Sequence, residues 1–132
     1  DAEYLEDNFD EEDLAEAGIY TQKYHEVTTT SFACGSATVE AYDSATVEAY
    51  GSATVEAYDS ATVKAYGSAT VKAYGSATVE AYDSATVKAC ENSYVEDLTG
   101  NIRPQSGYAV IKDYYNHKIY IKKGRYQIIE VD

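Results

Sequence analysis

The sequence predicts an all-β protein, a two-sided parallel β-solenoid of about 16 residues per coil with a short N-terminal helical cap and a C-terminal antiparallel β-meander. Three observations lead to this prediction. Residues 36–91 consist of seven near-identical copies of the octad SATVEAYD, in which Lys can replace Glu and Gly can replace the final Asp. Apolar and polar residues alternate within each copy, as in a strand. A period of eight is also too short for a helical repeat unit and is out of phase with 3.6 residues per turn.

The first 27 residues are expected to form an acidic cap. Asp10 is suited to N-cap a short helix over residues 11–17, and Gly18 is suited to end it. Acidic residues in the first turn complement the helix dipole. An apolar-alternating stretch from Ile19 to Val27 then leads into the first coil.

Residues 28–99 are predicted to form the solenoid, because a decayed octad precedes the exact copies and another follows them. Within an octad, Ala37, Val39 and Ala41 fall on one face of a strand, and a charged residue falls on the other. An unpaired charge is costly to bury. The Ala-Val-Ala face is therefore predicted to point inward, toward a narrow core.

Each octad ends in a Ser preceded by Asp or Gly, which predicts a corner. Asp43, Gly51, Asp59 and Gly67 alternate, so two octads are expected to complete one coil, although Gly75 and Asp83 break this alternation. Strands stacked at about 4.8 Å would give a rod roughly 20 Å long.

The outward positions are predicted to stack in columns. One charged column holds Glu40, Glu56, Lys72 and Lys88, and the other holds Glu48, Lys64 and Glu80. Neighbouring charges of opposite sign are expected to attract, by about 0.2–1 kcal/mol for each exposed pair. Two aromatic rows accompany them: Tyr42, Tyr58 and Tyr74, ending at Cys90, and Tyr50, Tyr66 and Tyr82, beginning at Cys34.

The two cysteines fall on different rows at opposite ends of the solenoid. A disulfide needs Cα atoms within about 7 Å, so Cys34 and Cys90 are predicted to remain reduced and to be structural replacements for tyrosine. The tyrosine rows themselves have two interpretations. Stacked rings stiffen the solenoid edge, or a continuous aromatic stripe forms a contact surface.

Residues 100–132 are predicted to form a second cap. Three strands are expected, over Tyr108–Tyr115, Lys118–Lys123 and Arg125–Val131, with turns at 116–117 and 123–124. Solenoids expose unpaired strand edges that invite aggregation, and for this reason caps are expected at both ends.

Charge is distributed unevenly along the 132 residues. The net charge of -13 comprises -9 in residues 1–27, -7 in residues 28–100 and +3 in residues 101–132. This balance argues against direct binding to nucleic-acid phosphates. No apolar run of about 18 residues exists, so no membrane span is predicted. Oppositely charged ends suggest head-to-tail self-association.

No catalytic constellation is seen, and the protein is predicted not to be an enzyme. His25 and His117 stand in no metal-ligand spacing with another His or Cys. The calcium-binding nonapeptide pattern is missing, and charged columns interrupt the Thr array that an ice-binding face would need. We therefore predict no metal and no cofactor.

The units GSATVEAY and DSATVKAY resemble octad repeats in uncharacterised β-solenoid proteins of gut and other Gram-positive bacteria and their phages. This resemblance covers residues 28–99 and implies a phage or prophage origin, but no activity. The rod shape and charge are also similar to those of pentapeptide-repeat proteins, some of which mimic duplex DNA. The period of eight and the interrupting lysines Lys64, Lys72 and Lys88 depart from that family.

Two functions are expected. The first is a non-enzymatic binding protein, such as a phage-encoded inhibitor of a basic, CRISPR-type nuclease, acting in the bacterial cytoplasm. The second is a structural rod in a phage fibre, spike or surface appendage, located in the virion or at the cell surface. Asp1 in place of Met is typical of a processed or trimmed N-terminus.

The candidate partner-binding residues are the acidic and aromatic side chains expected on the surface. They are Glu3, Glu6, Asp7, Asp10, Glu11, Glu12, Asp13, Glu40, Glu48, Glu56, Tyr42, Tyr58, Tyr74, Tyr50, Tyr66 and Tyr82.

Overall fold

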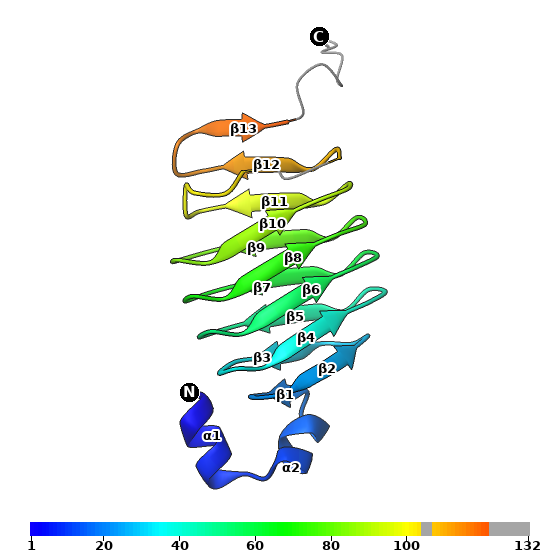
Figure 1. Cartoon of the computed structure of the whole chain (residues 1–132), viewed down its shortest axis with the longest axis vertical. Helices are drawn as coiled ribbons and strands as arrows, with labels where there is room; N and C mark the ends of the chain where they lie inside the picture. Colours follow the sequence, from blue (N-terminus) through cyan, green and yellow to red (C-terminus); the bar gives the residue numbers. More distant parts are fainter. Residues whose placement is uncertain (104–106, 122–132) are drawn as a thin grey trace.

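The computed structural model describes residues 1–103 and 107–121, which form a stack of short strands with two helices at its N-terminal end (Figure 1). The helices are α1 (Ala2–Asn8) and α2 (Glu11–Glu16). The strands belong to two sheets on opposite sides of the stack, which we call the long sheet and the short sheet. This arrangement confirms the two-sided parallel β-solenoid.

The long sheet has eight strands in the order β1-β3-β5-β7-β9-β11-β12-β13. Its strands are β1 (Ile19–Tyr20), β3 (Ser31–Ala33), β5 (Thr46–Ala49), β7 (Thr62–Ala65), β9 (Thr78–Ala81), β11 (Tyr94–Asp97), β12 (Val110–Asp113) and β13 (Lys118–Tyr120). The short sheet has five strands in the order β10-β8-β6-β4-β2. Its strands are β2 (Tyr24–Val27), β4 (Thr38–Ala41), β6 (Thr54–Ala57), β8 (Thr70–Ala73) and β10 (Thr86–Ala89).

Equivalent octad residues lie directly above one another through the repeat. Val39 pairs with Val55 in the short sheet, and Val47 pairs with Val63 in the long sheet, so each coil advances by 16 residues. The first coil is shorter, because Tyr24 pairs with Thr38. The predicted coil length is therefore confirmed for the repeat, and the coil that leads into it is tighter.

The core is a narrow column of alanine and valine. Every inward Ala and Val from Val39 to Ala81 is 0% exposed. Burying a valine side chain contributes roughly 1.5–3 kcal/mol, whereas alanine contributes less but allows the two sheets to approach closely. Stability therefore depends on the number of stacked coils, because each coil contacts only its neighbours.

The corners explain why Asp and Gly share one octad position. Gly51 and Asp59 have φ of +59° and +55°, in the left-handed region that glycine and, less readily, aspartate adopt. An acidic residue gains a further interaction: Asp59 Oδ2 accepts a hydrogen bond of 3.0 Å from the Asp43 N–H one coil below. Asp83 accepts from the N–H of Gly67 in the same way.

The N-terminal cap contains one predicted helix and one that the prediction missed. Asp10 caps α2 by accepting from the Asp13 N–H, as expected, and Leu14 is the one buried side chain of that helix. Helix α1 was not predicted, because it buries no side chain and so has no clear apolar face. Its N-cap is Asp1, whose side chain accepts from the Tyr4 N–H at 2.9 Å.

Parallel pairing extends beyond the octads at both ends. The stretch from Ile19 to Val27 supplies β1 and β2, which pair with β3 and β4. At the other end, β12 pairs in parallel with β11. The coil pattern therefore starts before residue 28 and continues past residue 99.

The C-terminal cap contains an antiparallel pair, β12 and β13, in which Ile111 pairs with Tyr120. The predicted turn at 116–117 is present, with His117 at φ +57°. Within the described residues, the meander starts as a further solenoid strand and adds one antiparallel strand. The third expected strand, Arg125–Val131, and the turn at 123–124 lie outside the described residues.

Two aspartates replace alanine inside the C-terminal coils. Asp97 and Asp113 are paired in register and are 0% and 1% exposed. The carboxylate of Asp97 accepts hydrogen bonds from the backbone N–H groups of Thr99, Gly100 and Ile102, at 2.7, 3.1 and 3.2 Å. These donors offset the cost of burying the polar carboxyl group, so Asp97 shapes the loop that follows β11.

Asp113 plays the same part after β12. It accepts 2.8 Å hydrogen bonds from both the backbone N–H and the side-chain amide of Asn116. Burial acts to raise the pKa of Asp113, but these bonds outweigh it and hold the pKa below its usual value. The Asn116 amide also donates to the Gly100 carbonyl oxygen at 3.1 Å, which joins the two loops.

The corner geometry yields a stability prediction at Asp59. Asp59→Ala removes the carboxylate acceptor yet keeps a Cβ in the left-handed region, so we expect the free energy of unfolding to fall by about 1–2 kcal/mol. Asp59→Gly relieves the backbone and should cost less than about 1 kcal/mol. Urea denaturation of the two variants measures the difference, and equal losses would contradict the role assigned to the corner.

A second stability prediction concerns Ser93, which takes the place of an inward alanine. Its side chain is 1% exposed, and its Oγ has no hydrogen-bond partner in the described structure. Ser93→Ala should raise the free energy of unfolding by about 1 kcal/mol, because a buried hydroxyl without a partner is costly. Ser84→Ala at an exposed corner serves as the control, and a loss of stability in Ser93→Ala would refute the prediction.

Candidate binding surfaces

The first candidate surface is the acidic end, defined as the exposed carboxylates of α1 and α2. The structure brings all seven predicted acidic cap residues to this end of the stack (Figure 1). Asp10 and Glu11 have partners within the chain, as N-cap and as ion-pair acceptor. The remaining carboxylates of the two helices are exposed and make no hydrogen bond or ion pair with the described residues: Glu3, Glu6, Asp7, Glu12, Asp13 and Glu16.

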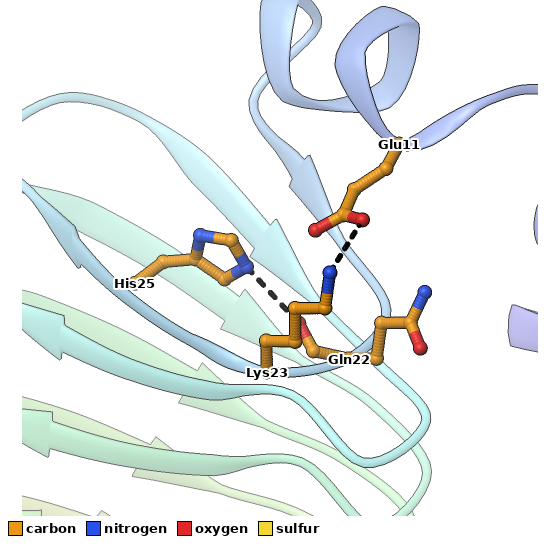
Figure 2. A network of polar contacts seen from close by, with 4 residues as sticks. All are labelled: Glu11, Gln22, Lys23 and His25. Carbon is orange, nitrogen blue, oxygen red and sulfur yellow. Dashed lines mark hydrogen bonds and ion pairs between the residues drawn. The ribbon is translucent and has the colours of Figure 1, made fainter.

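An ion pair ties this end to the first coil. Lys23 Nζ lies 2.8 Å from Glu11 Oε2, which links α2 to the loop between β1 and β2 (Figure 2). From β2, His25 Nε2 donates to the carbonyl oxygen of Gln22 in this loop at 3.0 Å. Lys23 therefore has an ion-pair partner on α2, and this pair holds α2 against the solenoid.

The second candidate surface comprises the charged columns, whose predicted order is confirmed. Glu40 pairs with Glu56 and Glu56 with Lys72 in the short sheet. Glu48 pairs with Lys64 in the long sheet. Opposite charges therefore lie on neighbouring coils as predicted, although no lysine of these columns lies within ion-pair distance of a glutamate in the described residues.

The glutamates instead accept hydrogen bonds from tyrosines two residues further along the same chain. Tyr50 donates to Glu48 at 2.5 Å, Tyr58 to Glu56 at 2.9 Å and Tyr82 to Glu80 at 2.7 Å. Tyr42 donates to Glu40. Each of these phenols therefore orients the carboxylate that precedes it by two residues.

The third candidate surface consists of two stacked tyrosine rows. In the short-sheet row, ring centroids lie 5.0 Å apart for Tyr42 and Tyr58 and 5.2 Å apart for Tyr58 and Tyr74. In the long-sheet row the spacings are 5.0 and 4.9 Å, and ring planes differ by 6–7°. The rings follow the spacing of the strands, so identical rungs force them to stack.

The long-sheet row continues beyond Tyr82, the last residue that the sequence pattern assigned to it. Leu98 and Tyr114 take the next two positions after Tyr82, since their N–H groups donate to Ala81 and Asp97 of the coil below. Both are exposed, at 43% and 41%. Counting 16 and 32 residues on from Tyr82 would have found them, but the decayed octads hid the pattern.

The cysteines lie where the rows predict them. Cys34 is one coil below Tyr50, whose N–H donates to the Ala33 carbonyl oxygen, and Cys90 is one coil above Tyr74, with its N–H bonded to Ala73. Both thiols are free, as predicted. Cys90 is 6% exposed, whereas Cys34 is partly exposed beside α1, and burial raises the pKa of its thiol.

Carboxylate acceptors change the acidity of the phenols. Hydrogen bonding to the neighbouring glutamate, followed by burial, raises the pKa of Tyr42, Tyr50 and Tyr82 to about 12. The pKa of Tyr58 is raised further for the same reasons. Glu40, which accepts from both Tyr24 and Tyr42, has a lowered pKa.

Within residues 1–103 and 107–121, no group of three or more His, Cys, Asp or Glu side chains is placed to hold a metal ion. Neither described helix is long and apolar enough to cross a membrane. Comparison with family models, curated proteins and solved structures finds no match to the chain.

The phenol–carboxylate bonds predict a late alkaline titration. Free tyrosines titrate near pH 10, but Tyr42, Tyr50 and Tyr82 should remain protonated until about pH 12. Because their pKa is raised by folding, the associated stability is complete below pH 10 and is lost as pH rises through 12. The ultraviolet absorbance of phenolate measures this titration, with the urea-unfolded chain as reference.

Paired variants locate the cause of the late titration. The double variant Glu48→Gln with Glu80→Gln should lower the pKa of Tyr50 and Tyr82 toward that of a free tyrosine. An amide oxygen accepts a weaker hydrogen bond from the phenol than a carboxylate does. Glu12→Gln, on α2 and remote from any tyrosine contact, should leave the curve unchanged. Identical curves for both proteins would rule out the phenol–carboxylate explanation.

Proposed function

We propose that the chain is a non-enzymatic binding protein whose acidic end docks on a basic, nucleic-acid-binding protein. The observation that carries this proposal is the gathering of unpaired, exposed carboxylates on α1 and α2 at one end of the rod. A cluster of like charges raises the local potential and steers an oppositely charged partner. The rest of the solenoid then acts as a rigid support.

The distribution of charge along the rod supports docking by this end. The glutamates nearest the acidic end, Glu26, Glu40 and Glu56, stack without an intervening lysine. Further along, Lys72 and Lys88 replace them in the same column. A basic surface that covers α1 and α2 can therefore extend over the first short-sheet strands before it meets repulsion.

The class of partner we favour is an RNA-guided nuclease of bacterial defence, inhibited by a phage-encoded protein. Such a nuclease has a positively charged channel for nucleic acid. A narrow acidic rod could occupy part of that channel. The octad resemblance to phage and bacterial proteins is the reason for choosing this partner, and the exposed carboxylates supply the chemistry.

Binding to a purified CRISPR nuclease at increasing salt tests the proposal. Glu3→Gln with Glu6→Gln should weaken binding about five- to thirty-fold, because each of the two exposed pairs contributes about 0.5–1 kcal/mol. The matched control is Glu80→Gln with Glu96→Gln, which removes the same charge away from the acidic end and should have little effect. Duplex DNA should compete, and affinity should fall steeply with salt.

Two results would sink this proposal. One is binding that does not respond to salt, and the other is equal weakening by the two pairs of substitutions. No binding to the nuclease would exclude this partner class. Acidic-end variants tested against other basic nucleic-acid-binding proteins would then decide whether the surface is used at all.

A structural rod is the second candidate, favoured by the uniform stacking of the octads. Coils in register can be added or removed without changing the contacts within each coil. A fibre or appendage module would use this property. Detection of this protein in purified virions would support the structural function over the inhibition of a nuclease.

A further inference from the structure

Each tyrosine row ends in a thiol, and neither candidate function uses this arrangement. The short-sheet row runs from Tyr42 through Tyr58 and Tyr74 to Cys90. Its ring planes differ by only 10° and 11°, at centroid separations of 5.0 and 5.2 Å. Rings this close overlap electronically, so an electron can pass between them without a diffusing carrier.

Cys90 cannot readily be reached from solvent. Its side chain is 6% exposed, whereas Tyr42, Tyr58 and Tyr74 are partly exposed along the edge of the solenoid. An oxidant too large to enter the stack can therefore contact the row but not the thiol. Oxidation of Cys90 by such a reagent would have to arrive through Tyr74.

We propose that the row Tyr42–Tyr58–Tyr74 relays one-electron oxidation from the surface to the buried thiol of Cys90. Cys90 is then a modification site for oxidants that it does not touch. The ligand class is any bulky one-electron oxidant that meets the tyrosine row. This inference stands apart from the proposed docking function, since it uses neither α1 nor α2.

The hydrogen bonds of the row favour entry at its N-terminal end. A phenol that loses an electron also has to lose its proton. The hydroxyl groups of Tyr42 and Tyr58 already donate to Glu40 and Glu56, which can take that proton at once. The residue two before Tyr74 is Lys72, which cannot accept a proton, so Tyr74 is the less favourable entry point.

Each electron transfer along the row is accompanied by the transfer of a proton. The oxidant takes one electron from Tyr42, and the phenolic proton passes to Glu40. Tyr58 then gives an electron to the Tyr42 radical, which regains its proton from Glu40 while the Tyr58 proton passes to Glu56. Tyr74 reduces the Tyr58 radical, which recovers its proton from Glu56, and the Tyr74 proton is released to water.

In the last step, Cys90 gives an electron and its S–H proton to the Tyr74 radical and becomes a thiyl radical. All three tyrosines are restored. The net change is reduction of the oxidant by one electron, conversion of the thiol to a thiyl radical and release of one proton to water. A nitrone spin trap then captures the thiyl: the sulfur forms a bond to the nitrone carbon, the C=N π bond breaks, and the unpaired electron remains on the resulting nitroxide.

The experiment uses the full chain with Cys34→Ser, which leaves Cys90 as its single thiol. A ruthenium polypyridyl complex, photo-oxidised in the presence of a sacrificial electron acceptor and without oxygen, supplies the bulky oxidant, and the small nitrone DMPO is added to capture the thiyl. After illumination the protein is unfolded and alkylated, and mass spectrometry counts the remaining thiol. We expect the Cys90 thiol to be lost.

Tyr74→Phe and Tyr66→Phe, each in the Cys34→Ser chain, form a matched pair. Both keep a stacked ring, both remove a hydroxyl, and both follow a lysine by two residues. Phenylalanine is much harder to oxidise than tyrosine, so Tyr74→Phe should reduce the loss of thiol several-fold. Tyr66→Phe lies in the other row and should have no effect.

Three outcomes would overturn the relay: equal thiol loss in the two variants, no loss in the Cys34→Ser parent, or loss in the parent that Tyr74→Phe does not reduce. The same illumination in urea controls for the photochemistry, because the unfolded chains should lose thiol alike. Unchanged thermal unfolding of Tyr74→Phe would show that the ring still packs.

Discussion

In-register stacking of identical coils is the constraint on which the whole structure depends. Because each residue lies above its octad equivalent, one valine creates a continuous core column and one tyrosine creates a row of rings. The same repetition places like charges above one another, which would destabilise the stack if the carboxylates lacked partners. The phenols two residues away supply those partners.

The corner position has to adopt a left-handed backbone conformation, and it can also accept a hydrogen bond from the neighbouring coil. Every octad must turn through a left-handed residue, which favours glycine on conformational grounds. Aspartate pays some backbone strain but accepts an N–H from the coil below, so the two residues are alternative solutions to one problem. The mixed Asp and Gly corners need no ligand to explain them, and Asp43 and Asp59 act as turn residues.

Prediction from sequence succeeded where a pattern repeated or where local capping and turn residues were clear, and it failed where burial depended on distant contacts. Alternation and period were enough for the inward Val39, the tyrosine rows and the separation of Cys34 from Cys90, and cap chemistry was enough for α2. Helix α1 was missed because it buries nothing, and buried Asp97 was missed because its donors come from the following loop. The acidic end could be predicted as a charged segment, but not which of its carboxylates are free.

The sequence by itself determined the solenoid, its coil length and the order of residues along every column, since these follow from a two-octad period and the geometry of strands. Only the tertiary structure decided which partners the side chains choose. Glu48 is the register partner of Lys64, but its carboxylate accepts a hydrogen bond from Tyr50, and the periodicity alone does not show this choice. Burial of Cys90 at the end of a tyrosine row is likewise a property of the assembled coils.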